Sequence, residues 1–173
     1  ATADVLLAEG ADLEGRALDG STPLLIASRS MDALAGIDWR IIPSQSGHQD
    51  TALFFINQGA DVGATDKRGR TALHAAVETR RPILAKALID AGAAIDGQFR
   101  TQPTPLRGDY ISRNSFKGAS PFWLAARDAN LPMMRILLEA GADPFLPNAY
   151  NVTPLMIASG LGENDARRPQ DHL

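Results

Sequence analysis

The sequence predicts an all-α fold: a solenoid of helix-turn-helix units joined by β-hairpin-like turns, with two loop insertions. Two recurring motifs and the constant spacing between them support this prediction. The first motif is a Gly-Ala pair that follows an apolar run, and it begins at Gly10, Gly59, Gly92 and Gly141. The second is a Thr or Ser that leads into an apolar segment, and it occurs at Thr22, Thr71, Ser120 and Thr153.

The spacing of the two motifs defines the repeat. The step from Gly59 to Thr71 is 12 positions and the step from Thr71 to Gly92 is 21, which together make a unit of 33 residues. Two steps are longer, because Thr22 to Gly59 takes 37 positions instead of 21 and Gly92 to Ser120 takes 28 instead of 12. Each exceeds the expected step by 16 positions, so we predict two insertions in an otherwise regular array.

Each motif has a local reason in backbone chemistry. In Thr22-Pro23 the Thr is a favoured N-cap, and the Pro fits the first helical position, where its missing N–H does no harm. A Gly just past an amphipathic run, such as Gly92, is typical of a helix that ends in a left-handed residue. Two positions before each N-cap stands a residue that tolerates positive φ in a tight turn: Gly20, Gly69, Gly118 or Asn151. The predicted order is therefore turn, first helix, second helix.

This register divides the chain, taken as one domain over 1–173, into consecutive segments. They are a partial repeat at 1–16, a repeat at 17–65 with its insertion at 31–46, a regular repeat at 66–96, an insertion at 97–114, a repeat at 115–147, and a partial repeat with a polar tail at 148–173. Terminal repeats normally carry a polar outer face, whereas this chain opens and closes within a repeat. We therefore expect it to be an excerpt of a longer protein.

The repeat resembles the ankyrin repeat family. The fullest match is 66–76, DKRGRTALHAA, which is close to the family pattern D-x-x-G-x-T-P-L-H-x-A-A. The resemblance covers nearly all of the chain outside the insertions, and 118–144 is similar to bacterial ankyrin repeat proteins. It implies a non-catalytic module that binds a protein partner through turn tips, the concave helix face and the insertion at 97–114.

Departures from the family pattern concern the residues that brace neighbouring repeats. Ala17 and Ser115 stand where the pattern has Asp, and Asn151 stands where it has Gly. The His of the pattern is present as His74, and in the other repeats it is replaced by Leu25, Trp123 and Met156. We predict an intact fold whose bracing hydrogen bonds are weaker away from 66–96.

The composition excludes several classes of function. A net charge of -3 argues against nucleic-acid binding, because such domains usually carry a clear basic excess. The absence of cysteine excludes disulfides, thiolate metal sites and cysteine nucleophiles. No run approaches the roughly 20 apolar residues of a membrane span, so we expect no membrane insertion. The compartment stays open between the cytoplasm and a bacterial periplasm.

The sequence offers no set of residues for catalysis or for a cofactor. Its three histidines, His48, His74 and His172, contain no pair at metal-ligand spacing. Phosphate-binding glycine loops, Gly-x-Ser-x-Gly and His-Glu-x-x-His are all missing. We therefore expect neither an enzyme nor a cofactor or metal site.

What remains is a surface for a protein partner. The family's binding positions, together with arginine and aromatic side chains of the kind enriched at interface hot spots, predict the following partner-binding residues: Lys67, Arg68, Arg70, Glu78, Arg107, Tyr110, Phe116, Lys117, Arg127 and Tyr150. The same positions in the first complete repeat include Arg16, Asp19, Ser21 and Arg29.

The partner-binding residues include a positive strip on an acidic protein. The insertion at 97–114 holds three arginines against one aspartate, and Lys67, Arg68, Arg70 and Lys117 lie beside it in the register. The strip predicts a partner with an acidic surface. The alternatives left open are that the charges only solvate the edge and that this insertion is a disordered or self-packed loop. The other insertion, with Trp39, Ile41 and Ile42, is expected to pack against its own repeat.

Two functions from different classes fit these observations. The first is a binding module that inhibits, scaffolds or tethers its partner. The alternative is a targeting or regulatory arm of a larger enzyme or receptor. The oligomeric state stays open.

Overall fold

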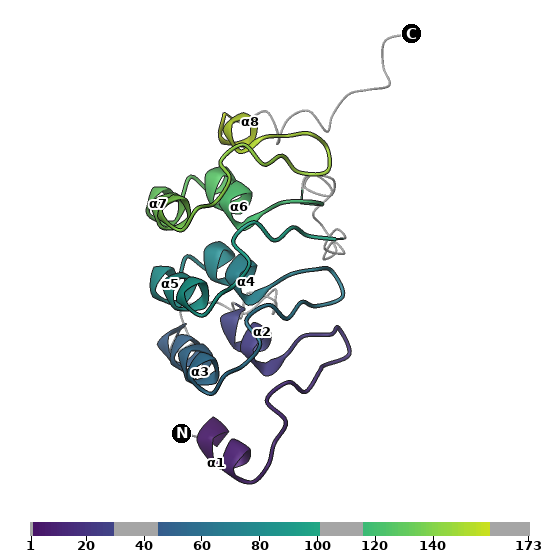
Figure 1. The fold of residues 1–173 in the computed structure, drawn as a ribbon, viewed down its shortest axis with the longest axis vertical. Coiled ribbons are helices and arrows are strands. Elements are labelled where there is room, and N and C mark those ends of the chain that lie inside the picture. The colour runs from purple at the N-terminus through teal and green to yellow at the C-terminus, as the bar shows by residue number, and fades with distance from the viewer. Residues whose placement is uncertain (1, 30–44, 101–115, 160–173) are drawn as a thin grey trace, which may run out of the picture. The chain divides into compact units, whose positions relative to one another are not determined.

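The computed structural model describes residues 2–29, 45–100 and 116–159 (Figure 1). Its helices are α1 (Thr2–Ala8), α2 (Pro23–Ser28), α3 (Gln45–Asn57), α4 (Ala72–Glu78), α5 (Pro82–Asp90), α6 (Pro121–Arg127), α7 (Leu131–Glu139) and α8 (Pro154–Ala158). All regular secondary structure in the described ranges is helical, which confirms the all-α prediction.

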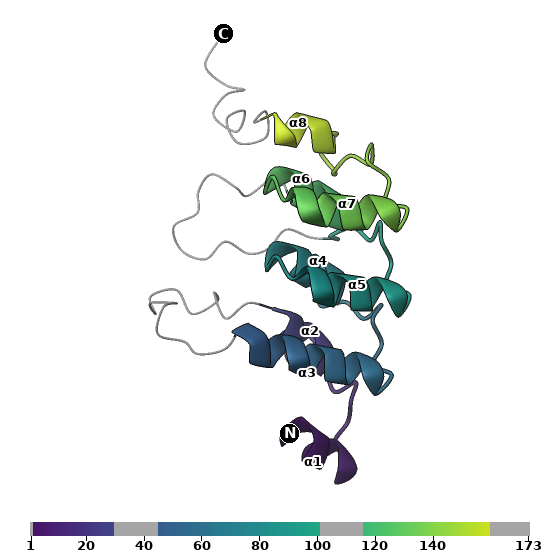
Figure 2. The same cartoon turned by 90° about the vertical axis from the view of Figure 1, so that its left-hand side faces the viewer.

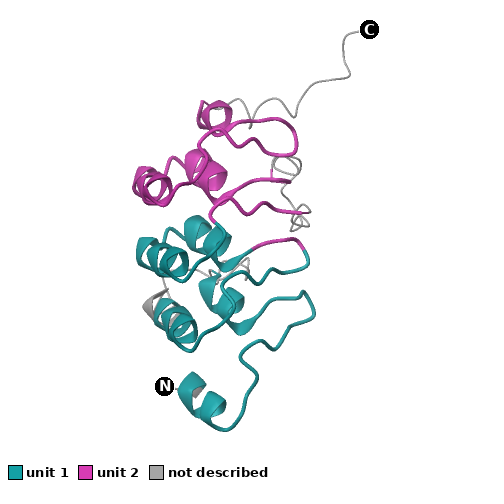
Figure 3. Cartoon of the chain, in the orientation of Figure 1, with its two compact units in different colours: residues 1–67, 71–94 teal, residues 68–70, 95–173 magenta. Residues whose placement is uncertain are grey.

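The chain forms two compact units (Figure 3). Unit 1 covers 1–67 and 71–94, and unit 2 covers 68–70 and 95–173. In unit 1, α2 contacts α3 and α4 contacts α5, while α2 also packs against α4 and α3 against α5. In unit 1, α2 and α4 thus form one layer and α3 and α5 form another; Figure 2 shows α3 in front of α2 and α5 in front of α4. In unit 2, α6 packs against both α7 and α8.

The predicted N-caps are present at all four first helices. The hydroxyl oxygens of Thr22, Thr71, Ser120 and Thr153 each accept a hydrogen bond from the backbone amide three residues further on. At α4 the cap is reciprocal, because the His74 side chain also accepts from the backbone amide of Thr71. The Thr-Pro and Ser-Pro pairs therefore begin helices for the local reason that the sequence indicated.

The predicted left-handed residues also have positive φ. The glycines that follow second helices have φ between 84° and 94°, and the turn residues Gly20, Gly69, Gly118 and Asn151 have φ between 60° and 83°. Sequence analysis missed Arg80 and Ala129, which have φ values of 54° and 48° in the links between first and second helices. Neither is a glycine, so no sequence rule pointed to them.

The core lies between the helices of each pair and their neighbours. The first helices α2, α4 and α6 bury an apolar residue two positions after the cap, namely Leu24, Leu73 and Phe122, whereas Leu155 of α8 is 79% exposed. Second helices bury residues three or four positions apart, such as Leu84 and Leu88 in α5. Each such side chain contributes roughly 1.5–3 kcal/mol to folding by leaving water.

The hydrogen bonds of the turns locate the second insertion. In the first turn the Ala17 amide donates to Ser21 O at 3.0 Å, and the Gly20 amide donates to Ala17 O at 2.8 Å. In the interrupted turn the same two bonds run from the Phe99 amide to Ala119 O at 3.2 Å and from the Gly118 amide to Phe99 O at 2.9 Å. Phe99 therefore holds the turn position that sequence analysis assigned to Ser115.

With Phe99 as the first residue of the turn, the inserted residues lie nearer the tip of the turn than the sequence predicted. Phe99 is 4% exposed and Arg100 follows it in the turn, so both belong to the repeat although they fall within the predicted insertion 97–114. The additional residues then lie between Arg100 and Lys117. Helix α3 likewise begins at Gln45, inside the other predicted insertion, 31–46. Trp39, Ile41 and Ile42, which were expected to pack on the repeat, lie outside the described residues.

Candidate interaction surface

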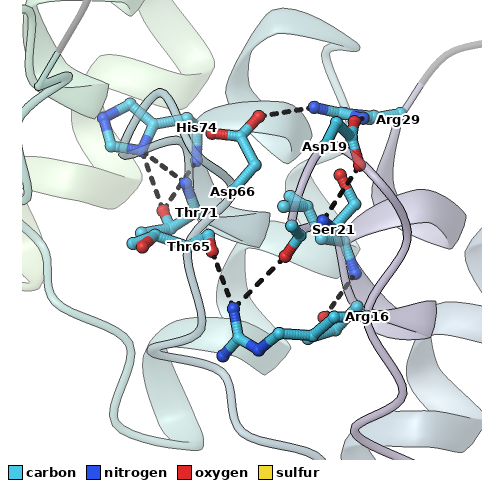
Figure 4. Close-up of polar contacts among 11 residues, drawn as sticks. Arg16, Asp19, Ser21, Arg29, Thr65, Asp66, Thr71 and His74 are labelled. Atoms are coloured by element: carbon cyan, nitrogen blue, oxygen red, sulfur yellow. Dashed lines mark hydrogen bonds and ion pairs between the residues drawn. The ribbon is translucent and has the colours of Figure 1, made fainter.

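The turn side of unit 1 is held together by an ion-pair network around Arg29 (Figure 4). Arg29 donates through one terminal nitrogen to Asp19 Oδ2 at 2.8 Å and through the other to Asp66 Oδ2 at 2.6 Å. The Asp66 side chain is only 2% exposed, so a charged partner is essential there. The hydrogen bond from Arg29, with a further one from the Ser21 amide, holds the pKa of Asp19 well below its usual range.

A second arginine in this network binds backbone oxygens. One terminal nitrogen of Arg16 donates to Gly20 O at 3.2 Å and to Thr65 O at 3.1 Å, which joins two successive turns (Figure 4). Ser21 is fully buried beside them. The binding positions carried over from the family to the first repeat, which include Arg16, Asp19 and Arg29, therefore serve the cohesion of unit 1.

The turns themselves are linked by one recurring backbone hydrogen bond. In unit 1 the Lys67 amide donates to Asp19 O at 2.9 Å. In unit 2 the Arg100 amide donates to Arg68 O and the Ala149 amide donates to Lys117 O, each at 2.8 Å. Each bond joins the tip of one turn to the tip of the turn before it. Within each unit, the backbone therefore places the linked tips next to one another.

In unit 2 this row is cationic, and we call it the basic turn edge: Arg68, Arg70, Arg100 and Lys117. The described turn residues of unit 2, which are 68–70, 97–100, 116–120 and 148–153, include no Asp or Glu. Arg100 and Lys117 are exposed, and neither side chain makes a hydrogen bond or ion pair with any residue that the structure describes. Within the described residues, the charges of Arg100 and Lys117 are thus not paired with an acidic side chain.

Two predicted partner-binding residues, Phe116 and Arg127, meet in a compact cluster. The Arg127 guanidinium lies 4.5 Å from the centroid of the Phe116 ring, and its Nε donates to Asp128 Oδ1 at 2.6 Å. The Phe116 ring in turn meets Trp123 edge to face, with centroids 6.4 Å apart. Both predicted residues therefore already have partners within unit 2, through contacts of the cation–π and aromatic type.

Trp123 also replaces the bracing histidine of the family pattern. Its indole Nε1 donates to Val152 O in the next turn at 2.9 Å, across 29 positions of sequence. A bracing hydrogen bond is therefore present here although the His is replaced, and the prediction of weaker bracing away from 66–96 stays a prediction. His74 itself shares a 2.8 Å hydrogen bond between its Nδ1 and the Thr71 hydroxyl.

The other predicted residues are dispersed. Lys67 is exposed in unit 1, and Glu78 is half-buried at the end of α4. Tyr150 is 47% exposed in the last described turn, and Arg107 and Tyr110 lie outside the described residues. Arg100 was not among the predicted site residues. Aligning Phe99-Arg100 with Asp66-Lys67 across the insertion would have found it.

Among the described residues, neither a metal-binding group nor a membrane-spanning helix is present. No group of three or more His, Cys, Asp or Glu residues among them is arranged to hold a metal ion. Nor does any described helix combine the length and apolar character needed to cross a membrane.

Comparison with known proteins agrees with this architecture. Residues 37–89 match the family model described as "Ankyrin repeats (many copies)". Residues 117–149 match the model described as "Ankyrin repeat". The B-cell lymphoma 3 protein homolog of Mus musculus is 30% identical over 148 residues, which are 85% of this chain and 26% of that protein. The neurogenic locus notch homolog protein 1 of Xenopus laevis is 30% identical over 174 residues, which are 90% of this chain and 7% of that protein.

The chain therefore spans about a quarter of one relative and a much smaller share of the other. Both relatives are animal proteins, so the similarity to bacterial proteins stays a prediction. The matches cover both compact units and agree with the paired helices, the capped first helices and the linked turns. From its sequence matches and its structure together, the chain belongs to the ankyrin repeat family.

Proposed function

We propose that this chain binds an acidic segment of a protein partner through the basic turn edge of unit 2. Ankyrin repeats are protein-interaction modules, so the class of function follows from the family. The proposal adds the surface that binds, which is the basic turn edge, and the chemical groups of the partner, which are carboxylates. Lys67, which directly precedes the edge in the chain, extends the same positive run.

One observation carries the proposal: two exposed turn cations of unit 2 have no side-chain partner within the described chain, whereas Arg29 of unit 1 has two. In unit 1, Arg29 is paired with Asp19 and Asp66 at 2.8 and 2.6 Å. In unit 2, Arg100 and Lys117 are exposed and make no side-chain hydrogen bond or ion pair within the described chain. Uncompensated charges of one sign on a fixed backbone attract and orient a partner of the opposite sign.

A role as the targeting or regulatory arm of a larger enzyme or receptor is the second candidate. It is favoured by the small share of each relative that the chain spans, 26% and 7% in the two comparisons. In either case we infer that this segment itself is not catalytic. Whether the bound partner is inhibited, scaffolded or targeted belongs to the whole protein.

The test is a binding titration of the full chain with two labelled peptides, one rich in Asp and Glu and one with Asn and Gln at the same positions. The key variant is Arg100→Ala with Lys117→Ala. Its matched control is Lys86→Ala with Arg135→Ala, which removes the same charge from exposed positions of α5 and α7.

We expect the acidic peptide to bind more tightly than its amide counterpart. The edge variant should weaken that binding by about fivefold, or roughly 1 kcal/mol, because two exposed charge pairs are lost. The control variant should stay close to wild type. Equal losses in both variants, or equal binding of the two peptides, would refute the proposal.

A further inference from the structure

The basic turn edge is continued by a turn of different chemistry. The Ala149 amide donates to Lys117 O at 2.8 Å, so the last described turn directly follows the turn that carries Lys117. The approach of the two turns is close, since a Cβ added to Gly118 would lie 2.6 Å from the Ala149 nitrogen. The tip of the last turn carries Tyr150, which is 47% exposed, in place of a cation.

The backbone on both sides of Tyr150 is held by hydrogen bonds. Asn148 is 4% exposed, and its Oδ1 accepts from the amides of Tyr150 and Val152, both at 3.0 Å. The Asn148 amide closes the turn on Val152 O at 3.0 Å, and Trp123 Nε1 donates to the same oxygen at 2.9 Å. The tyrosine is therefore presented on a backbone that needs little ordering when a partner binds.

An exposed aromatic residue on a fixed turn has the properties of an interface anchor. Tyrosine offers a large apolar face with few rotatable bonds, and such residues dominate binding energy in many interfaces. Its neighbours at the tip, Ala149 and Asn151, carry no charge. Along unit 2 the edge thus changes from cationic at Arg100 and Lys117 to uncharged and aromatic at Tyr150.

We propose that the partner segment is bipartite, with carboxylates that contact Arg100 and Lys117 and an apolar side chain that packs on Tyr150. This inference rests on the proposed function and adds the second half of the ligand. Each hairpin turn has two extended arms, and neighbouring arms lie about 5 Å apart, so equivalent residues of successive turns are about 10 Å apart. An extended partner chain spans that distance in about three residues. The apolar residue of the partner should therefore follow an acidic residue by about three positions.

The two halves of such a ligand have different signatures in solution. Exposed charges act mainly on the association rate, and their effect falls as salt is added. Apolar packing acts mainly on the dissociation rate and is nearly insensitive to moderate salt. Removing Lys117 and removing Tyr150 should therefore change different measured quantities.

The experiment uses the full chain and two labelled peptides, an acidic probe with Leu three positions after its last Glu and an acid-only probe with Ala at that place. Dissociation constants and rates are measured at about 50 mM and about 300 mM salt. The variants are Tyr150→Ala, Tyr150→Phe and Lys117→Ala, and the urea unfolding of each is recorded so that only folded variants are compared.

Tyr150→Ala should weaken binding of the Leu probe by about fivefold through faster dissociation, with its salt dependence unchanged, and leave the acid-only probe unaffected. Tyr150→Phe should restore most of the loss, because the ring rather than the hydroxyl makes the contact. Lys117→Ala should weaken both probes and flatten their salt dependence.

The outcomes separate this inference from the proposed function. If Tyr150→Ala changes both probes equally or neither, the bipartite ligand is refuted, while a dependence on Lys117 would leave the acidic partner standing. If neither probe depends on Lys117 or on salt, the proposed function fails and the inference fails with it. If Tyr150→Ala alone changes the salt dependence, the assignment of apolar packing to Tyr150 is wrong.

Discussion

Single residues with left-handed backbone follow the second helices of this protein and occupy its turns. Gly118 has a φ of 76° and lies against the next turn, whereas Gly141 has a φ of 94° with no heavy atom within 4 Å of an added Cβ. Both positions favour glycine for conformational reasons. Only Gly118 also requires glycine because the next turn leaves no room for a Cβ.

This contrast gives a prediction about two equivalent substitutions. Gly141→Ala should lower the free energy of unfolding by roughly 1–2 kcal/mol, the cost of a left-handed conformation for a residue with a Cβ. Gly118→Ala should lower it by at least about 1 kcal/mol more, because overpacking against backbone is added to the same strain. Urea unfolding of the two variants measures both values. Equal losses would mean that the close approach at Gly118 relaxes without cost.

The contribution of Asp19 to the stability of the protein depends on the charge of its carboxylate. Because its folded pKa is depressed by Arg29, Asp19 stabilises the protein above its unfolded pKa of about 4, and this contribution is lost as the pH falls toward the folded pKa. The side chain is 53% exposed, so solvent screening makes the effect small. Asp19→Asn should therefore be less stable than wild type at neutral pH, and the difference should shrink below about pH 4.

The measurement is urea unfolding of both proteins at a series of pH values. Asn keeps an acceptor for the Ser21 amide and removes the charge, so the comparison isolates the ion pair. A stability difference that is the same at every pH would contradict the assignment of this effect to the Asp19 carboxylate.

At the scale of elements, cohesion comes from side chains that reach from one helix to the next turn. In unit 2 this is Trp123 of α6, whose Nε1 donates to Val152 O at 2.9 Å. In unit 1 Arg81, which is buried before α5, reaches Ala27 O of α2 at 3.4 Å. Burial lowers the pKa of Arg81 from its ordinary value. Each bond links a buried side chain to a backbone carbonyl of another helix or turn.

Trp123→Phe tests this bracing. The variant keeps an aromatic ring in α6 and removes the donor. Because Val152 O still accepts from the Asn148 amide, we expect the loss of one net hydrogen bond, about 0.5–1.5 kcal/mol. Amide hydrogen exchange should become faster in the turn at 148–152 and remain unchanged in α4, which serves as the internal reference. Unchanged exchange at 148–152 would show that the indole bond does not hold that turn.

At the scale of the whole molecule, the repeat continues across the second insertion. Phe99 and Arg100 begin a turn that Lys117 and Gly118 complete, as the hydrogen bonds of Phe99 with Ala119 and Gly118 demonstrate. The residues between Arg100 and Lys117 are therefore additional to a turn of ordinary length. Loops of this kind contribute little to the stability of the elements that they interrupt.

Deletion of 101–116 should therefore join Arg100 to Lys117 and leave a regular repeat. We expect nearly unchanged helical far-UV circular dichroism and a cooperative unfolding transition. A second deletion, 99–114, removes the same number of residues but takes the buried Phe99 and keeps the half-buried Phe116, so it should be less stable by about 1 kcal/mol. Global unfolding of the first variant would mean that 101–116 belongs to the core.

Much of the fold could be predicted because it depends on local backbone preferences repeated at a constant period. The caps at Thr22, Thr71, Ser120 and Thr153 and the left-handed glycines follow from the residue types alone. The boundary of the second insertion could not be placed in this way. Ser115 and Phe99 are both possible first residues of the turn in the sequence, and only the bonds of Phe99 distinguish them.

By itself, the sequence determined the repeat, its helices, its caps and the class of function, since the chemistry of each depends on residues close together in the chain. Only the tertiary structure decided which charges are available to a partner. Arg29 and Asp66 are 37 positions apart yet pair at 2.6 Å, whereas Arg100 and Lys117 are brought into one edge with no acidic residue among its described turns. Whether an arginine or lysine is paired with a carboxylate depends on which turns pack against each other. Such packing brings together residues that are far apart in the sequence.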